Sequence, residues 1–271
     1  MPSRRRPNPD APLLVAKLGG SLWTQPEALR GWLAALARYA GPLTIVPGGG
    51  PFADAVRAAQ SSLRFSNAAA HEMAIMGMEQ YALALADLAP ALVLVETPAE
   101  AALAHRRGAA ALWRPLATTR CAPQIPASWD MTSDSLAAWH AHEAGAEALL
   151  LIKSVDIASP RHRTDVDEGG APTSPSRGEV ERRRRSGGGD SPSLGSTPPR
   201  AASRLDPPPE GEGGASAAAP IVDACFAHHA RGLAVFLAGP ADLEAAGERA
   251  SRGAIPGAAY EFLTREQSIA S

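Results

Sequence analysis

The sequence of 271 residues predicts an α/β protein with a mainly parallel central sheet that helices cover on both faces. Three observations support this prediction. Short, almost continuous apolar runs alternate with helix-like segments, glycine-rich turns follow two of these runs, and one polar segment, 160–214, interrupts the alternation. In a sheet of this kind, a ligand is expected in the crevice at the carboxyl ends of the strands.

The expected strands share short length and dense aliphatic content, which is typical of strands buried on both faces. They are residues 13–17, 43–47, 92–96, 109–113, 149–153 and 233–237. A less regular, proline-containing stretch separates the fourth strand from the helix that precedes the fifth. Because each strand except the fourth is followed by a helical pattern, the strands are expected to run parallel.

The expected helices are placed by start signals and by apolar periodicity. Thr24 with Glu27, and Thr97 with Glu100, have capping-box spacing, while Pro51 suits the first turn of a helix. Met73, Met76 and Met78 are expected in the core rather than in a site. The helices are expected at 24–39, 51–63, 68–88, 97–108, 133–145, 222–230 and from 240.

The interrupting segment, 160–214, differs in composition from the rest of the chain. It contains nine Pro, ten Gly and only four large aliphatic residues, and its nine Arg are balanced by nine acidic residues. Such a segment cannot bury enough apolar surface to offset its conformational entropy, so we expect a disordered low-complexity insertion. Residues 1–159 and 215–271 are then expected to form one domain.

Composition excludes several classes of function. The formal net charge of −2 disfavours nucleic acid as a partner, and no apolar run approaches the roughly 20 residues that a membrane helix needs. Cys121 and Cys225 are far apart and outside any zinc-ligand spacing, which disfavours a disulfide scaffold or a structural metal site. We therefore expect a cytoplasmic protein with a small-molecule substrate.

Lysine is rare in this chain. Of 26 cationic residues, only Lys17 and Lys153 are lysine, and each stands at the end of an apolar strand-like run. A lysine that persists where other cationic positions are arginine suggests a need for a compact ammonium group that can move. The alternative is that the two lysines have no special role.

Two glycine turns follow the first two expected strands. Lys17 precedes Gly19, Gly20 and Ser21, and Val46-Pro47 precedes the run Gly48-Gly49-Gly50. Glycines let the backbone approach a ligand closely, and no packing reason for three in succession is evident, so the run suggests anion binding at a helix start. Gly48-x-Gly50-x-x-Ala53 also fits a relaxed dinucleotide fingerprint, which leaves a Rossmann oxidoreductase open.

Two further motifs carry charged groups. Residues 128–135 place Asp130 and Asp134 with several hydroxyls at a helix start, where an aspartate is either a cap or a ligand for a lysine, substrate or Mg²⁺. Residues 149–156 end a strand with Lys153 and continue to Asp156. A lysine in the crevice can neutralise charge on a phosphoryl group that is being transferred.

In this order, the four motifs resemble the amino acid kinase family, which includes aspartate, acetylglutamate and uridylate kinases. The resemblance implies an open αβα sandwich and transfer of the γ-phosphoryl group of ATP, with Mg²⁺, to a carboxylate or phosphate. It implies that Lys17 contacts the ATP phosphates, that Asp134 organises the lysine and that Lys153 stabilises the transition state. For ATP and its phosphates, the resemblance implies Gly19, Gly20, Ser21 and Asp156. For the acceptor and the γ-phosphoryl group, it implies Gly48, Gly49 and Gly50.

A narrower resemblance involves residues 66–80, 128–135 and 152–156. These stretches are similar to kinases that phosphorylate (aminomethylfuranyl)methyl phosphate in methanofuran-type cofactor synthesis, whose relatives act in one-carbon metabolism. An acceptor that already carries a phosphate fits a site with glycine turns, a lysine and Arg57, and His71 and Asp130 are interpreted as further substrate contacts.

No metal ligand is assigned from the sequence, because residue 75 is Ile where a zinc HExxH motif starting at His71 needs a second His. A homo-oligomer is expected. The alternatives to this kinase are a non-catalytic nucleotide- or oxyanion-binding protein on the same fold, and a kinase of the family with a carboxylate or nucleotide acceptor.

The composition of 160–214 generates the first testable prediction. Deleting this segment is expected to leave the rest of the chain folded, because the segment offers little apolar surface to a core. The check is thermal unfolding of the deletion variant followed by circular dichroism. Loss of a cooperative transition would show that the segment is structural.

Overall fold

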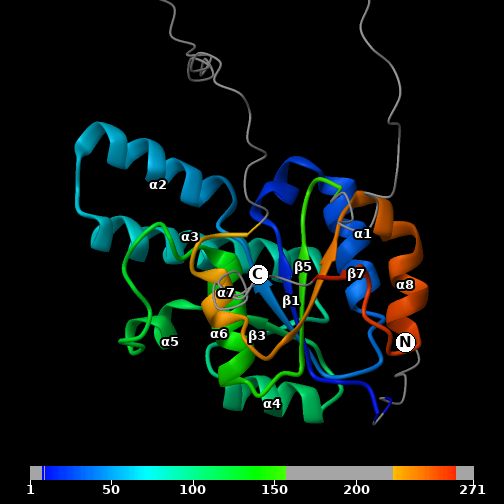
Figure 1. Cartoon of the computed structure of the whole chain (residues 1–271). Coiled ribbons are helices and arrows are strands. Elements are labelled where there is room, and N and C mark those ends of the chain that lie inside the picture. The colour runs from blue at the N-terminus through cyan, green and yellow to red at the C-terminus, as the bar shows by residue number, and fades with distance from the viewer. Residues whose placement is uncertain (1–7, 9, 157–221, 261–271) are drawn as a thin grey trace, which may run out of the picture. The chain divides into compact units, whose positions relative to one another are not determined.

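The structure, a computed structural model, describes residues 8, 10–156 and 222–260 (Figure 1). These residues form a seven-stranded sheet in the order β3-β4-β2-β1-β5-β6-β7. Every pairing is parallel except that of β6 with β7. The strands are β1 (Leu14–Leu18), β2 (Leu43–Pro47), β3 (Val93–Val95), β4 (Ala111–Trp113), β5 (Ala148–Ile152), β6 (Ala234–Ala238) and β7 (Ala258–Ala259).

Helices connect the strands and cover both faces of the sheet. They include two 3₁₀ segments, η1 after β1 and η2 after β6. The helical elements are η1 (Gly20–Thr24), α1 (Pro26–Leu36), α2 (Gly50–Leu63), α3 (Asn67–Leu88), α4 (Pro98–Arg106), α5 (Leu116–Arg120), α6 (Ser133–Glu143), α7 (Phe226–His229), η2 (Pro240–Asp242) and α8 (Leu243–Ser251).

The period-two alternation of the strands gives the sheet two buried faces. Leu14, Ala16 and Leu18 of β1 pack in a cluster with apolar side chains of α1, α3 and α8. Val15, between them in sequence, belongs to a second cluster with side chains of α6 and α7. Figure 1 shows α1 with α8 on one side of the sheet and α6 with α7 on the other. The prediction of an open αβα sandwich with a mainly parallel sheet is therefore confirmed.

The strand order reverses at β1, which positions the candidate site. β1 pairs with β2 on one side and with β5 on the other, and all three run parallel. The loops that leave β1 and β2 therefore emerge at the same edge of the sheet, beside the end of β5. In open α/β sheets, ligands bind in the crevice at such a switch point.

Several expected elements differ from the observed ones. The capping box at Thr24 is wrong: Thr24 ends η1 and its hydroxyl donates to the Ser21 carbonyl, while Gln25 is the N-cap of α1. Thr97 does cap α4, because its hydroxyl accepts from the Glu100 amide. The strand expected at 233–237 lies one residue later, and the helices expected on either side of it are shorter than expected. The sequence does not predict α5 or β7, because both are short and lack a periodic apolar pattern.

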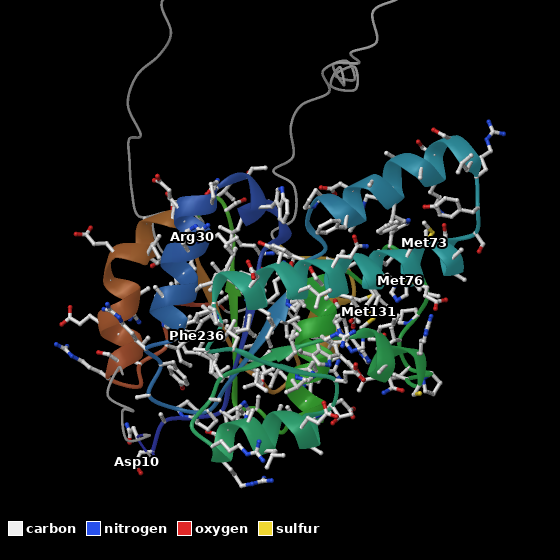
Figure 2. All side chains as sticks on the ribbon, turned by 180° about the vertical axis from the view of Figure 1, so that it is seen from behind. Asp10, Arg30, Met73, Met76, Met131 and Phe236 are labelled. Atoms are coloured by element: carbon white, nitrogen blue, oxygen red, sulfur yellow. The ribbon has the colours of Figure 1, made fainter. Side chains whose placement is uncertain are left out.

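The methionines of α3 are only partly a core feature. Met78 is buried, as expected, but Met73 and Met76 are 40% and 37% exposed (Figure 2). The prediction that all three are core residues is therefore wrong for these two, because the helical positions 73 and 76 lie on a face of α3 that no other element covers fully.

Segment 160–214 lies outside the described residues. Across the described ranges, no helix combines the length and apolar character needed to cross a membrane.

The buried imidazole of His140 in α6 generates a stability prediction. His140 stacks on Trp113, is 1% exposed and has no hydrogen-bond partner on either ring nitrogen. Burial and then the nearby His105 lower the pKa of His140 from 6.5 to about 3. The native state keeps this ring neutral while the unfolded chain protonates it, so stability is expected to fall as the pH decreases from 6.5 towards 3.

The check compares urea unfolding of the wild type and of His140→Phe at pH 7 and pH 5. The wild type is expected to lose about 2 kcal/mol more than the variant over this interval. His142→Phe, at an exposed position of the same helix, is the matched control and is expected to follow the wild type. Identical pH dependence in all three proteins would contradict the prediction.

Candidate active site

The two lysines of the chain lie on one face and at one end of the sheet. On β1, Lys17 follows Val15 on the face that α6 covers, and its register partner on β5 is Leu151. Lys153 comes two residues after Leu151, so the strand alternation directs it to the same face. The parallel pairing of β1 and β5 thus brings together two side chains that are 136 positions apart in the sequence.

Both ammonium groups bind one buried carboxylate. Asp134 is the second residue of α6 and is 5% exposed. Lys153 Nζ donates a hydrogen bond to Asp134 Oδ2 at 2.5 Å. Lys17 Nζ forms an ion pair with Asp134 Oδ1 at 2.8 Å. Two positive charges therefore share one negative charge.

The pKa shifts reflect this excess of positive charge. Burial alone would raise the pKa of Asp134, but the charges of Lys17 and Lys153 outweigh it and hold the pKa below its ordinary value. Burial, followed by repulsion from Lys17, lowers the pKa of Lys153, and attraction by Asp134 opposes both effects. An incoming anion would relieve the repulsion between the two ammonium groups, so the cluster is suited to anion binding.

The two glycine turns pack against each other. A Cβ atom on Gly48 would lie 2.3 Å from the amide nitrogen of Gly20, and one on Gly20 would lie 2.4 Å from the amide nitrogen of Gly50. Gly50 also has φ +54°, which favours glycine. The glycine run therefore has a packing reason, contrary to the expectation from the sequence. Close approach of the two turns is what brings their backbones to one crevice.

The remaining residues expected near ATP lie at the ends of β1 and β5. The Gly19 amide donates to the Ile152 carbonyl at 2.9 Å, and this bond extends the pairing of the two strands. Ser21 Oγ and Ser154 Oγ lie 2.7 Å apart. Asp156 is exposed, and its Oδ1 accepts a hydrogen bond from the Ala241 amide at 2.8 Å. Asp156 therefore joins the end of β5 to the turn after β6.

A pocket of about 290 Å³ opens beside the glycine turns, between α2, α3 and the start of α6. Gly20, Gly49 and Gly50 form one wall, and Thr132 and Ser133, which directly precede Asp134, form another. Lys17, Lys153 and Asp134 are not among the lining residues. The apolar part of the lining consists of Ala53, Ala74, Ile75, Met78, Met131 and Leu136.

A cation and an aromatic ring lie together in the pocket wall. The Arg57 guanidinium lies 4.5 Å from the ring centroid of Trp129 and pairs with Asp54 at 2.8 Å. The indole nitrogen of Trp129 donates to Gln60 Oε1 at 2.7 Å, which fixes the ring against α2. The wall therefore offers a planar apolar surface next to a positive charge that can bind an anion.

His71 lines the same pocket and has one ring nitrogen without a hydrogen-bond partner. Its Nδ1 lies 3.2 Å from the Ser128 carbonyl, and because a carbonyl only accepts, Nδ1 carries the proton. Nε2 is buried and has no hydrogen-bond partner. Burial lowers the pKa of His71, although the bond to Ser128 opposes the shift. The neutral ring therefore leaves Nε2 to accept a hydrogen bond from a ligand.

Asp130 is not brought into the pocket wall. It is exposed, and its carboxylate accepts from Ser128 Oγ at 3.1 Å. The expectation that Asp130 meets the substrate or Mg²⁺ stays a prediction. Within the described residues there is no group of three His, Cys, Asp or Glu side chains that could hold a metal ion. Mg²⁺ commonly relies on one or two carboxylates and on substrate phosphates, and the exposed carboxylates of Asp130 and Asp156 are compatible with that mode.

Sequence reasoning did not single out three residues that shape the site. Trp129 and Thr132 lie inside a motif that the sequence indicates, but only its aspartates are predicted as site residues. Thr132 is expected, with Ser133 as the alternative, only as a helix cap, and it is the N-cap of α6. Asp223 gave no signal, because it precedes a short helix that follows the interrupting segment. Its role comes from contacts with Thr132 and Ser135 at the start of α6, which are 91 and 88 positions away in the sequence, and no local pattern predicts such contacts.

Comparisons with known proteins give one family match and several similar solved structures. A model described as the amino acid kinase family matches residues 12–165. The chain is similar in structure to uridylate kinase from Archaeoglobus fulgidus, with 18% identity and a TM-score of 0.44 over 57% of this chain and 69% of that one. UMP kinase from Bacillus anthracis is 15% identical, with a TM-score of 0.42 over 58% of this chain and 71% of that one. UMP kinase from Ureaplasma parvum is 16% identical, with a TM-score of 0.42 over 58% of this chain and 74% of that one. The curated proteins contain no match to this sequence.

The packing of the two glycine turns generates a prediction. Gly48→Ala is expected to lower the free energy of unfolding by about 1–3 kcal/mol, because its Cβ would overlap the backbone of Gly20. Urea unfolding measures this loss. Gly247→Ala is the control: its Cβ would meet the flexible end of Arg38 at 3.2 Å, inside helix α8, where alanine is favoured over glycine. Equal stability of the two variants would contradict the prediction.

Proposed function

This chain belongs to the amino acid kinase family, and we propose that it is an ATP-dependent kinase that transfers the γ-phosphoryl group to a small phosphorylated acceptor. The observation that carries this proposal is the convergence of both lysines on Asp134 at the switch point of the sheet. Phosphoryl transfer needs little covalent chemistry from a protein, and its main requirements are positioning and compensation of negative charge. The ammonium groups of Lys17, which is buried, and Lys153, which is partly buried, provide such compensation.

Lys17, Lys153 and Asp134 each have a role in the proposed transfer. As the acceptor oxygen attacks in line, Lys17 and Lys153 stabilise the charge on the γ-phosphoryl oxygens. Asp134 holds both ammonium groups in place and lowers the cost of their mutual repulsion before ATP binds. Mg²⁺, when bound with ATP, would supply further positive charge against the phosphates. No covalent intermediate with the protein is required.

The two sides of the crevice suggest where each substrate binds. Gly19, Gly20 and Ser21 leave β1 beside the end of β5, and we place the ATP phosphates there, with Asp156 near the nucleotide. Gly48, Gly49 and Gly50 begin α2, and Gly49 and Gly50 face the pocket. We place the acceptor and the γ-phosphoryl group on that side, so that the two turns hold the reacting groups between them.

The chemistry of the pocket supports a particular kind of acceptor. Arg57 suits an anionic group such as a phosphate, Trp129 suits a small planar ring, and Nε2 of His71 suits a hydrogen-bond donor such as an ammonium group. (Aminomethylfuranyl)methyl phosphate combines these three features, which is why we propose it, or a similar phosphomonoester, as the acceptor. The proposal includes a single kinase domain formed by residues 1–159 and 215–271.

The direct test is a screen of acceptors with ATP and Mg²⁺ in which ADP and the phosphorylated product are both measured. The screen should include a phosphorylated aminomethylfuran, simple phosphomonoesters, uridine monophosphate and carboxylates. Turnover with the phosphorylated aminomethylfuran or a simple phosphomonoester supports the proposal, whereas turnover with uridine monophosphate or a carboxylate alone would support the alternative acceptors. ATP binding without turnover of any acceptor would instead indicate a non-catalytic nucleotide-binding protein.

The lysine cluster generates a prediction for the accepted substrate. Lys17→Ala and Lys153→Ala are each expected to lower kcat by about 10²–10³-fold, because each removes a charge that stabilises the transition state. Both variants should fold, since Asp134 keeps one cationic partner. Arg252→Ala, which removes an exposed cation paired with Glu248, is the control and should match the wild type. Near-normal kcat in either lysine variant would remove that lysine from the mechanism.

A further inference from the structure

One carboxylate from the C-terminal part of the chain binds the first turn of α6. Asp223 Oδ2 accepts hydrogen bonds from the Thr132 amide at 3.2 Å, the Thr132 hydroxyl at 2.6 Å and the Ser135 amide at 3.2 Å. Its Oδ1 accepts from the Ser135 hydroxyl and from the Cys225 amide. Thr132 and Ser135 stand on either side of Asp134, so Asp223 holds the backbone that carries the lysine-binding carboxylate.

A direct relay leads from Asp223 to Asp134. The Thr132 hydroxyl donates its proton to Asp223, which leaves its lone pairs free to accept from the Asp134 amide at 3.3 Å. Thr132 is the N-cap of α6, and its hydroxyl is oriented by the carboxylate that it binds. The position of Asp134 between Lys17 and Lys153 therefore depends on a residue outside 12–165, the part of the chain that the family model matches.

Asp223 also affects the site through its negative charge. Its negative charge raises the pKa of Lys153, against the larger effects of burial and of Lys17. The groups that face Lys153 and act on its pKa are thus Lys17 of β1, Asp134 of α6 and Asp223. Asp223 therefore acts on Lys153 from outside the cluster, in which Asp134 is the carboxylate that pairs with the two lysines.

We propose that Asp223 is a positioning residue for phosphoryl transfer: through Thr132 and Ser135 it fixes the first turn of α6, and with it the carboxylate of Asp134 between the two lysines. This inference rests on the proposed function. It assigns a role in the site to the segment that follows the interruption, although that segment supplies neither of the two lysines. A small displacement of groups that position reacting atoms can lower a rate on the order of 10²-fold.

The test uses the full chain and two independent readouts. The first is kcat, and its dependence on pH, for the accepted substrate. The second does not need turnover: because the chain has only two lysines, protein labelled with ¹³C at lysine Cε gives two side-chain signals, and Lys153→Arg identifies them. Titration of these signals reports the pKa of Lys153 directly.

Asp223→Asn is expected to lower kcat on the order of 10²-fold, to lower the pKa of Lys153 and to shift the alkaline limb of the kcat profile to lower pH. Thr132→Val, which breaks the relay but keeps the charge of Asp223, should lower kcat while the pKa of Lys153 stays closer to that of the wild type. Thr132→Ser, which restores a hydroxyl, should recover most of kcat.

Asp242→Asn is the matched control. Asp242 Oδ2 also accepts from a backbone amide, that of Gly239 at 2.9 Å, but it lies at the turn after β6 and is not among the groups that shift Lys153. This variant should lose stability without a change in the kcat profile or in the Lys153 titration. Changes in both readouts for Asp242→Asn as large as those for Asp223→Asn would overturn the proposal.

The proposal also fails if folded Asp223→Asn keeps kcat within about twofold and the Lys153 titration is unchanged. If Asp223→Asn does not fold, Thr132→Val provides the test. A kcat of Thr132→Val equal to that of the wild type would contradict the proposal that Asp223 acts on Asp134 through Thr132. If the wild type phosphorylates no acceptor, the proposed function fails, and the lysine titration alone decides whether Asp223 acts on the cluster.

Discussion

The structure around the site depends on one electrostatic constraint: two ammonium groups, of which that of Lys17 is buried and that of Lys153 is partly buried, share a single buried carboxylate. A buried charge is costly unless it is paired, and here Asp134 pairs with Lys17 and Lys153 at once. The two ion pairs offset the cost of burying these charges, but the cluster keeps an excess of positive charge. A polyphosphate can supply the balancing negative charge, so the constraint that shapes the folded state is also the property that a phosphotransferase needs.

The sheet topology makes this constraint possible. Only a parallel β1–β5 pair with this register directs Lys17 and Lys153 to one face at one end, and only α6 on that face can present Asp134 to both. The glycine turns serve the same geometry. Because Gly20 and Gly48 allow the backbones after β1 and β2 to touch, the loop at the ATP side and the loop at the acceptor side share one crevice rather than standing apart.

The segment after the interruption completes both the sheet and the site. β6 pairs with β5 along its length, so it supports the strand that leads to Lys153. Asp156 and Asp223 each bind backbone amides across the interruption, the first at the turn after β6 and the second at the start of α6. A long interruption is compatible with one folded unit when the chain on each side is bound in this way.

The sequence by itself determined the α/β class and most strands, and it indicated Lys17, Lys153 and Asp134 as candidate site residues. These features are local or compositional: apolar runs of strand length, glycines after strands and two isolated lysines. The sequence could not decide that the glycine run packs against Gly20, that Thr24 ends a 3₁₀ turn instead of capping a helix, or that Met73 and Met76 stay exposed. It also gave no sign of Trp129 stacking under Arg57 or of Asp223 binding α6. Those contacts join residues far apart in the chain, and only the tertiary structure brings such residues within bonding distance.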